Sequence, residues 1–401
     1  MTEKIFYRDA FISEFDAHVL SCTESGKGYF ETVLDRTAFY PEGGGQNGDT
    51  GWLLPDGAEG EKIRVFDTHE KDGLIRHYTK QPVAEGVSVH GILDFERRFG
   101  LMQNHSGEHI VSGLVNSRFG FNNVGFHMGA DVVTIDFDGE LTMDDLRSIE
   151  EAANEIVWRD LEVGIHVYDE HDCEGLSYRS KKELHGSVRL VTFPDADVCA
   201  CCGTHVKRTG QIGLIRIISA ERFRQGVRVQ MLCGRDAYRY DTAMVEQNHL
   251  VSVALSAKPA LTGEAVARLK ETAAADAYRV METEKKLFEM KAAALSGRGN
   301  VMLIEEDLSP DSVRRLTDAV MKTCKGIACV FSLCDDGARY ALGQENGDLR
   351  ELNKKLNTQL EGRGGGKPFF VQGSCKAGKE QIIRWARENG LDLSGGAHTE
   401  I

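Results

Sequence analysis

Two short motifs that carry pairs of metal-binding residue types constrain this chain more than any other feature. The first is His105-Ser-Gly-Glu-His109 and the second is Cys201-Cys-Gly-Thr-His205. In each motif the two residues are four positions apart, so on a helix or in a tight turn both side chains point the same way. Three histidines and one cysteine are a donor set that tetrahedral zinc favours. The sequence therefore predicts one zinc site built from two distant segments.

The identity of the sulfur ligand does not follow from spacing alone, because the second motif is rich in cysteine. Cys201 lies four residues before His205, the spacing of the histidine pair. Cys202 lies three residues before it and Cys199 six. All three thiols are therefore candidates at this point.

Polar residues around the first motif favour a catalytic zinc over a structural one. A site with four protein ligands is often structural, since catalytic zinc usually keeps one position open. Here the ligands come from separate elements, and Gln103, Asn104, Glu108 and His127 surround the motif. We take Glu108, His127 and Gln103 as candidate catalytic residues.

The first motif also fits the H-x-x-E-H pattern of a class of zinc peptidases, in which the glutamate activates a water molecule. That alternative requires a glutamate as third protein ligand and leaves Cys201 and His205 unexplained. It ranks below a site that uses all four donors.

Composition places limits on location and partners. The 401 residues allow two or three domains. No run approaches the roughly 18 apolar residues of a membrane span, and the N-terminus lacks the apolar core of a signal peptide. We expect a cytoplasmic protein with no membrane partner. The net charge of −14 argues against non-specific nucleic-acid binding, although residues 354–388 hold eight Lys or Arg against three Asp or Glu.

The pattern along the chain predicts an α+β fold in four parts. Residues 1–92 alternate apolar and polar positions between turn signals, which indicates a β-barrel-like domain with a Gly-rich loop. Residues 93–238 mix helices and strands in an α+β core that contains the zinc site. Residues 239–298 are helical, with a break at Lys258-Pro259, and form a long linker with coiled-coil character. Residues 299–401 form an α/β domain.

The Gly-rich loop between Thr37 and Gly51 is the second informative stretch. Three consecutive glycines, Gly43 to Gly45, permit positive φ and close approach of the backbone to a ligand. Their N–H groups suit a phosphate or a ribose. The alternative is a plain hairpin loop between strands. The stretch lacks the Lys-Ser/Thr of a P-loop, so nucleotide hydrolysis is not indicated.

A second Gly-rich run, residues 362–373, lies within the basic stretch. Arg363 and Lys367, with the aromatic residues Phe369 and Phe370, suit contact with a nucleic-acid backbone. The alternative is a turn before a strand, with the phenylalanines in the core.

In this order, these stretches resemble the trans-editing relatives of alanyl-tRNA synthetase, the AlaX proteins of the longer type. Residues 37–51 resemble the family's Thr-x-Phe-Tyr-Pro-x-Gly-Gly-Gln-x-x-Asp-x-Gly loop, and residues 104–109 and 201–206 resemble its two zinc motifs. Residues 124–129 fall where relatives line the amino-acid pocket. Residues 364–373 resemble the Gly-Gly-Gly-x-Pro segment of the synthetase's C-terminal tRNA-binding domain.

The resemblance selects Cys201 as the thiolate ligand and places Cys202 where a glycine is usual. It also shows two departures. Glu108 stands where synthetases commonly carry threonine, and Phe369 where aspartate is usual.

The resemblance implies a free-standing editing hydrolase that contains one zinc ion per chain, held by His105, His109, Cys201 and His205. It would cleave the ester between tRNA(Ala) and a wrong amino acid, chiefly serine, with glycine as a second candidate. A synthetase pocket built for alanine cannot strongly reject an added hydroxyl, so a separate hydrolytic site is needed. A third alternative is a tRNA-binding protein whose zinc only stabilises the fold.

The implied partner is misacylated tRNA(Ala), with a homodimer through the helical linker or the C-terminal domain as a further expectation. The expected substrate-binding residues come from the two Gly-rich stretches: Thr37, Gly43, Gly44, Gly45, Gln46, Asp49, Arg363 and Lys367.

Overall fold

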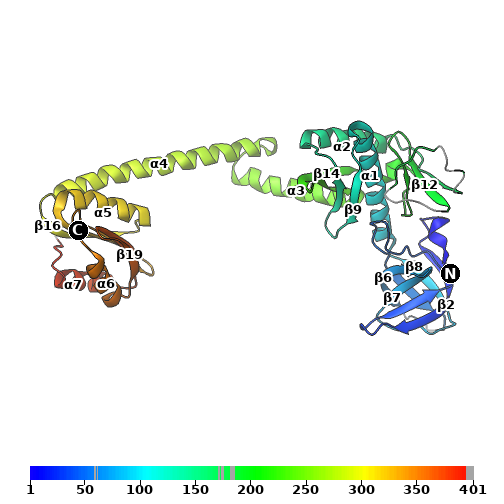
Figure 1. Ribbon diagram of the computed structural model, residues 1–401, viewed down its shortest axis with the longest axis horizontal. Coiled ribbons are helices and arrows are strands. Elements are labelled where there is room, and N and C mark those ends of the chain that lie inside the picture. The colour runs from blue at the N-terminus through cyan, green and yellow to red at the C-terminus, as the bar shows by residue number, and fades with distance from the viewer. Residues whose placement is uncertain (58–59, 61, 170–171, 173–175, 181–185, 394–401) are drawn as a thin grey trace. The chain divides into compact units, whose positions relative to one another are not determined.

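The structure, a computed structural model, describes residues 1–393 except 58–59, 61, 170–171, 173–175 and 181–185. The chain divides into two compact units, Met1–Leu250 and Val251–Ile401. Helices and strands are mixed in both (Figure 1), in agreement with the predicted α+β class. The four-part division of the chain stays a prediction.

The first unit begins with a closed six-stranded barrel, as the alternating pattern predicted (Figure 1). Its strands follow one another around the barrel in a fixed order: β2 (Glu14–Glu24), β3 (Phe30–Leu34), β7 (Leu74–Thr79), β6 (Ile63–Lys71), β5 (Gly51–Pro55) and β8 (Ser88–Leu93). Alternate side chains point inward, and Leu34, Phe39 and Leu53 are fully buried there. The short strand β1 (Glu3–Lys4) pairs in parallel with β4 (Arg36–Thr37) beside the barrel.

The barrel leads directly into helix α1 (Phe95–Phe119), which is the central element of the zinc-motif region. Asp94 caps its first turn by accepting from Arg97 N, and Gly120 ends it in the left-handed conformation. Residues 102–115 of the helix are all buried, the histidine motif included. The motif therefore lies in the protein interior, where neighbouring elements can hold each ring.

A four-stranded antiparallel sheet and one helix pack around α1. The sheet has the order β14 (Ile215–Phe223), β15 (Gly226–Cys233), β10 (Val133–Phe137) and β9 (Asn123–Met128). Helix α2 (Met143–Trp158) begins with a capping box between Thr142 and Asp145. These elements share one apolar core with α1, which includes Ile110, Ile135 and Val229.

A smaller antiparallel sheet delivers the second zinc motif. It consists of β11 (Gly164–Tyr168), β12 (Val188–Phe193) and β13 (Asp197–Ala200), and Cys201 follows the last of these strands directly. The motif then runs as a loop to the 3₁₀ turn η3 (Thr209–Ile212) and into β14.

The predicted helical linker corresponds to two helices, α3 (Gly234–Ala254) and α4 (Thr262–Ala294). The chain leaves the helical path at Ser256, whose φ is 49°, and passes through a 3₁₀ turn, η4 (Pro259–Leu261). Both helices present apolar side chains to solvent, among them Leu250, Leu269 and Met290. The coiled coil and the homodimer stay predictions.

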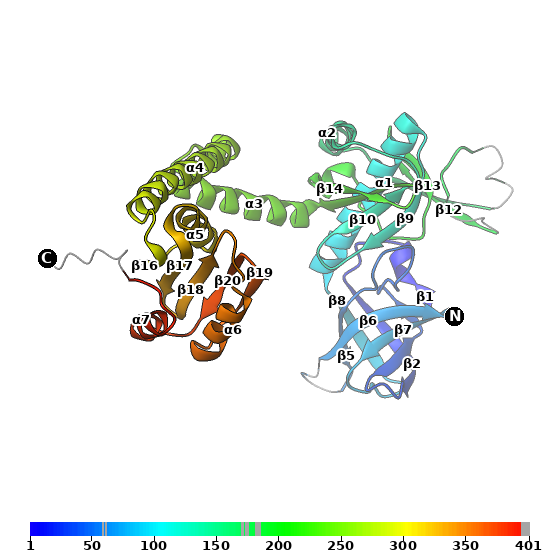
Figure 2. The same ribbon diagram turned by 60° about the vertical axis from the view of Figure 1, so that its left-hand side comes forward.

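The second unit contains a five-stranded sheet covered on both faces (Figure 2). The strand order is β16 (Gly299–Glu306), β17 (Lys325–Cys334), β18 (Gly337–Gly343), β20 (Phe370–Cys375) and β19 (Arg363–Lys367), and only β16 and β17 are parallel. The C-terminal end of α4 and α5 (Pro310–Cys324) pack on one face. Helices α6 (Arg350–Gln359) and α7 (Lys379–Glu388) cover the other. Among the described residues, no helix is both long and apolar enough to cross a membrane.

Candidate metal centre

Four side chains from the two motifs meet in the first unit. His105, His109, Cys201 and His205 each offer one ligand atom, and these atoms all lie within 4.8 Å of one another. The sulfur of Cys201 is 3.5 Å from His105 Nε2 and 3.4 Å from His205 Nε2. The three histidines are 2–3% exposed. The fold therefore assembles three imidazoles and one sulfur at a single buried point.

The other two cysteines of the motif lie elsewhere. Cys202 is exposed. Cys199 is buried and belongs to a second group, in which its sulfur lies near His109 and Asp197. Cys201 alone among them joins the four-residue cluster.

Each histidine ring is held by an oxygen atom at Nδ1, and this leaves Nε2 for the cluster. The pairs are His105 Nδ1 with Gln46 Oε1 at 2.9 Å, His109 Nδ1 with Asp197 Oδ2 at 2.9 Å, and His205 Nδ1 with Ser106 Oγ at 3.3 Å. Zinc-binding histidines usually have such a partner, which fixes the ring and its tautomer. The donor set and these partners fit zinc, which prefers nitrogen and sulfur ligands in a tetrahedral site.

The electrostatics of the cluster place a charged sulfur beside the rings. Burial opposes a charged Cys201, but the three neighbouring imidazoles together hold the pKa of its thiol well below the ordinary value. Burial lowers the pKa of His205 to about 3. Against the effect of burial, Cys201 and Asp197 raise the pKa of His109 well above its ordinary value. A divalent cation bound here would therefore displace a proton from His109.

Asp197 and Arg179 form a buried support behind His109. Arg179 donates from Nε to Asp197 Oδ1 and from Nη2 to Oδ2, both at 2.7 Å. Burial opposes the charge on Asp197, yet the hydrogen bonds from His109 and Arg179 hold its pKa below the ordinary value. The ionised carboxylate therefore accepts from His109 Nδ1 and keeps Nε2 directed at the cluster.

Gln46 connects the Gly-rich loop to both zinc motifs. Its Oε1 accepts from Thr204 N at 3.1 Å as well as from His105, and its Nε2 donates to Thr204 Oγ1 at 2.8 Å. The side chain is fully buried. The loop from the barrel is thus part of the wall of the candidate metal centre.

One glycine of the loop, Gly45, permits close packing against strand β9. A Cβ on Gly45, whose φ is +86°, would lie 2.4 Å from the Phe126 ring and 2.8 Å from Phe126 O. Gly43 N donates to Gln46 O, and Gln46 N donates back to Gly43 O. One of the three glycine N–H groups expected to face a ligand, that of Gly43, is therefore used within the loop.

Thr37 and Asp49 hold the ends of the loop in the interior. Thr37 Oγ1 lies 2.8 Å from His77 Nε2 and accepts from Phe39 N. Arg98, a fully buried side chain of α1, donates from Nε to Asp49 Oδ1 at 2.9 Å and to Oδ2 at 2.8 Å. The structure shows that Thr37 and Asp49 anchor the loop, and their contact with a substrate stays a prediction.

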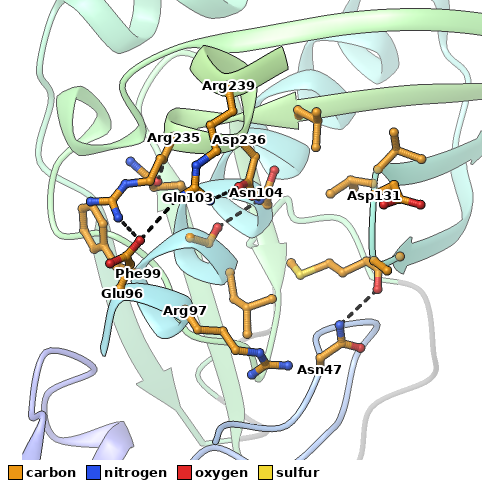
Figure 3. A pocket seen from close by; sticks show the side chains of 18 of the residues that line it. Asn47, Glu96, Arg97, Phe99, Gln103, Asn104, Asp131, Arg235, Asp236 and Arg239 are labelled. Carbon is orange, nitrogen blue, oxygen red and sulfur yellow. Dashed lines mark hydrogen bonds and ion pairs between the residues drawn. The ribbon is translucent and has the colours of Figure 1, made fainter. Parts of the chain in front are cut away.

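Glu108 lies next to the donors, whereas Gln103 and His127 do not. Glu108 is buried, accepts from Ser112 Oγ at 2.7 Å and from Asn123 Nδ2, and has Oε2 4.0 Å from His109 Nε2. Gln103 and His127 line a neighbouring cleft, as Figure 3 shows for Gln103. Gln103 is two positions from His105 on a helix and so faces roughly the opposite way. The Phe126 ring lies 5.1 Å from the His105 ring. Successive side chains of a strand point to opposite faces, so His127 points away from the metal donors.

Arg363 and Lys367 belong to the second unit. They lie at the two ends of β19, an edge strand whose five residues are all exposed. The glycine run therefore forms a strand, whereas the sequence led us to expect a flexible loop or a turn. Phe369 is exposed and Phe370 packs partly against the core, and contact of this stretch with nucleic acid stays a prediction.

Three supporting residues escaped sequence reasoning: Arg179, Asp197 and Asn123. Their partners are distant in sequence, and the contact between Arg179 and Asp197 depends on how β13 packs. One signal was present, because Asp197 is an acidic residue in a buried strand four positions before Cys201. A charge in that position needs a partner.

Two segments match known protein families. Residues 9–97 match the family described as tRNA synthetases class II (A), and residues 188–228 match the threonyl and alanyl tRNA synthetase second additional domain. The second range includes Cys201 and His205. The fold and the candidate metal centre thus define a protein of the class that shares domains with the alanyl-tRNA synthetases.

The relatives identify the family. The chain is 31% identical to the alanyl-tRNA editing protein AlaX-L of Pyrococcus horikoshii, over 97% of this chain and 98% of that protein. This protein belongs to the alanyl-tRNA editing protein family of AlaX-L. It is also 32% identical to the alanine–tRNA ligase of Halobacterium salinarum, over 86% of this chain and 39% of the ligase. The C-Ala domain of the Aquifex aeolicus alanyl-tRNA synthetase is 21% identical over 22% of this chain and 85% of that chain, with a TM-score of 0.21.

Proposed function

We propose that this protein is a zinc-dependent hydrolase that removes a wrong amino acid from tRNA(Ala), chiefly serine and secondarily glycine. One observation carries the proposal, namely the meeting of four metal donors beside the carboxylate of Glu108 in a member of an alanyl-tRNA editing family. The related AlaX-L protein is named for editing alanyl-tRNA. Editing of a charged tRNA means hydrolysis of its aminoacyl ester.

One zinc ion per chain would be held by His105, His109, Cys201 and His205. Zinc bound there would supply Lewis acidity or a fixed orientation for polar groups of the substrate. The supports at Gln46, Asp197 and Ser106 keep the three rings in place, so the donors need little rearrangement on binding.

Glu108 is the proposed general base. Ser112 and Asn123 fix its carboxylate, and Oε2 lies on the side of His109 that faces the metal donors. A carboxylate held in this way can accept the proton of an attacking water. Gln103 and His127, which line the adjacent cleft, are proposed to contact the tRNA next to the ester.

Selection of serine over alanine follows from the cost of unpaired polar groups. A buried site that hydrogen-bonds the serine hydroxyl leaves those groups unsatisfied when alanine is bound. Glycine offers no hydroxyl either, so we expect it to be a weaker substrate than serine, and a preference for glycine over alanine requires the site to exclude the alanine methyl group. The basic face of the second unit, with Arg363 and Lys367 exposed on β19, is proposed to bind the tRNA backbone.

Deacylation of purified aminoacyl-tRNAs tests the proposal. The protein is incubated with Ser-tRNA(Ala), Gly-tRNA(Ala) and Ala-tRNA(Ala), with and without a chelator, and zinc is restored to the chelated sample. We expect rapid loss of serine, slower loss of glycine, sparing of alanine and recovery with zinc. Equal hydrolysis of all three esters would remove the editing function. Binding of tRNA without hydrolysis would favour the non-catalytic alternative, and cleavage of peptides alone would favour the metallopeptidase.

A further inference from the structure

A large cleft lies in the first unit beside the candidate metal centre (Figure 3). Its volume is about 1310 Å³. Its walls are the first turns of α1, the connection from β9 to β10, the start of α3 and one residue of the Gly-rich loop, Asn47. None of the four metal donors lines it.

Two pairs of sequence neighbours connect the cleft with the metal centre. Gln46 bonds His105, and the next residue, Asn47, lines the cleft and donates to Met128 O at 3.1 Å. Phe126 stands beside the His105 ring, and the next residue, His127, also lines the cleft. Successive residues of an extended chain are roughly 3.3 Å apart. The two sites are therefore separated by little more than the thickness of one strand and one loop.

One wall of the cleft carries a cation without a carboxylate partner. The guanidinium of Arg97 donates to Gly48 O at 2.6 Å, and it forms no ion pair with any residue that the structure describes. Arg235 and Arg239 both contact Glu96, and Arg239 also lies 3.9 Å from Asp236, so each of these two cations has a carboxylate partner (Figure 3). The three arginines on this side of the cleft are matched by the carboxylates of Asp94, Glu96 and Asp236, so Arg97 is a local cation in a wall that is balanced in charge.

The remaining carboxylates near α1 are engaged with the protein. Asp94 caps the helix and lies 3.6 Å from Arg64 Nη2. Asp236 accepts from the Asn104 side chain at 3.0 Å. Both keep their charge, but each already has a partner in the protein, whereas Arg97 has no carboxylate partner among the described residues.

Asp131 places an exposed carboxylate on the opposite wall of the cleft. It belongs to the connection between β9 and β10 and lies across the cleft from Arg97 of α1 in Figure 3. Phe95 and Phe99 of α1 also line the cleft, and their rings stack at 6.3 Å. The cleft thus offers a cation, an acceptor and aromatic surface together.

We infer that this cleft binds the unpaired nucleotides that precede the esterified end of the tRNA, with Arg97 on a phosphate and Asp131 on a base amine. The inference rests on the proposed function, because it requires the ester to occupy the metal centre next door. Arginine binds phosphate oxygens. A carboxylate accepts from the exocyclic amine of cytosine or adenine, which uracil lacks. Bases also stack on aromatic side chains.

The first test measures Arg97→Ala on Ser-tRNA(Ala). Because Arg97 binds a part of the substrate that does not react, KM should rise roughly ten-fold while kcat stays unchanged. The slope of log affinity against log salt should become shallower by about 0.7, the value for one lost contact to a single strand. Arg147→Ala is the matched control, since Arg147 is an exposed arginine of α2 that lies outside the cleft.

The second test measures base preference with Asp131→Asn. Acceptor-stem minihelices ending in unpaired cytosines, or in uracils at the same positions, compete for binding in a fluorescence anisotropy assay. The parent protein should favour cytosine. The variant should bind both alike, because an amide offers a donor as well as an acceptor. Asp144→Asn on α2 is the control and should keep the preference.

The outcomes separate this inference from the proposed function. Hydrolysis of Ser-tRNA(Ala) by the parent protein, with an unchanged KM and salt slope in Arg97→Ala, overturns the cleft assignment and leaves the function standing. Absence of hydrolysis by the parent protein overturns the function itself. If Arg97→Ala loses zinc or thermal stability, its KM cannot be interpreted, and the base preference of Asp131→Asn becomes the deciding measurement. A retained cytosine preference in Asp131→Asn then overturns the inference.

Discussion

At the scale of the residue, the candidate metal centre depends on the side chains that orient the ligands as much as on the ligands themselves. His109 Nδ1 contacts Asp197, which in turn binds Arg179 through two hydrogen bonds. All of this lies in the interior, so loss of one charge leaves its partner buried and unpaired. The supporting carboxylate should therefore affect metal affinity although it is not a ligand.

Replacement of Asp197 by Asn tests that dependence. The amide keeps the shape but not the charge that orients His109, and we expect zinc affinity to fall roughly 10- to 100-fold. Competition with a chromogenic chelator measures the affinity directly. Asp195→Asn, which removes an exposed carboxylate paired with Arg159, serves as control. An unchanged affinity in Asp197→Asn would show that Asp197 does not position His109.

His77 makes the stability of the barrel depend on pH. Burial lowers the pKa of His77 to about 4, from 6.5 in the unfolded chain. The unfolded chain therefore binds the proton more readily, so this contribution is complete above pH 6.5 and is lost as pH falls toward 4. Between these values the free energy of unfolding should drop by about 1.4 kcal/mol per pH unit.

Urea unfolding at several pH values measures this loss. His77→Gln retains a polar side chain that does not titrate, and its stability should vary less over the same interval. Parallel curves for the two proteins would mean that His77 does not titrate as its burial indicates.

At the scale of the element, the sequence predicts the barrel and the ligand pairs because both depend on local periodicity. Alternation predicts β2 to β8, and a four-residue spacing predicts that His105 and His109 share a helix face. The meeting of the two distant motifs was predicted from their donor chemistry, but other contacts between distant segments could not be predicted. The side on which His127 lies depends on the register of β9, and the contact of Arg179 with Asp197 depends on how two segments meet. The glycine run at β19 is a strand only because β20 pairs with it.

The contact between the Gly-rich loop and β9 can be tested with two glycines. Gly44 and Gly45 both have positive φ, so alanine strains the backbone at either position. Only at Gly45 does the added Cβ meet Phe126, since nothing lies within 4 Å of the corresponding atom at Gly44. Gly45→Ala should therefore be less stable than Gly44→Ala by about 1–3 kcal/mol. Equal losses in denaturant unfolding would argue against tight packing of the loop on β9.

At the scale of the whole molecule, the two units are proposed to divide the work. All four candidate metal donors lie in Met1–Leu250, whereas the exposed basic strand β19 lies in Val251–Ile401. A protein with a net charge of −14 needs such local basic surface to bind RNA. Hydrolysis and much of the tRNA affinity should therefore be separable.

Truncation near Ser296 tests this division. The shortened protein should keep its zinc and its hydrolytic site but bind tRNA more weakly. The salt dependence of binding should also flatten, because phosphate contacts are lost. Filter binding at several salt concentrations measures both. If the truncated chain binds as tightly as the full chain, with the same slope, the second unit serves another purpose such as dimerisation.

The central claim is that the four-donor cluster binds the zinc on which editing depends, and a pair of cysteine variants tests it most directly. Zinc content and the rate of Ser-tRNA(Ala) deacylation are measured on the same preparations of the parent protein, Cys201→Ala and Cys202→Ala. We predict about one zinc per chain in the parent. Cys201→Ala should lose both zinc and activity, and Cys202→Ala, which removes an exposed thiol outside the cluster, should keep both. Full zinc content in Cys201→Ala, or hydrolysis at the parent rate by zinc-free protein, would contradict the account.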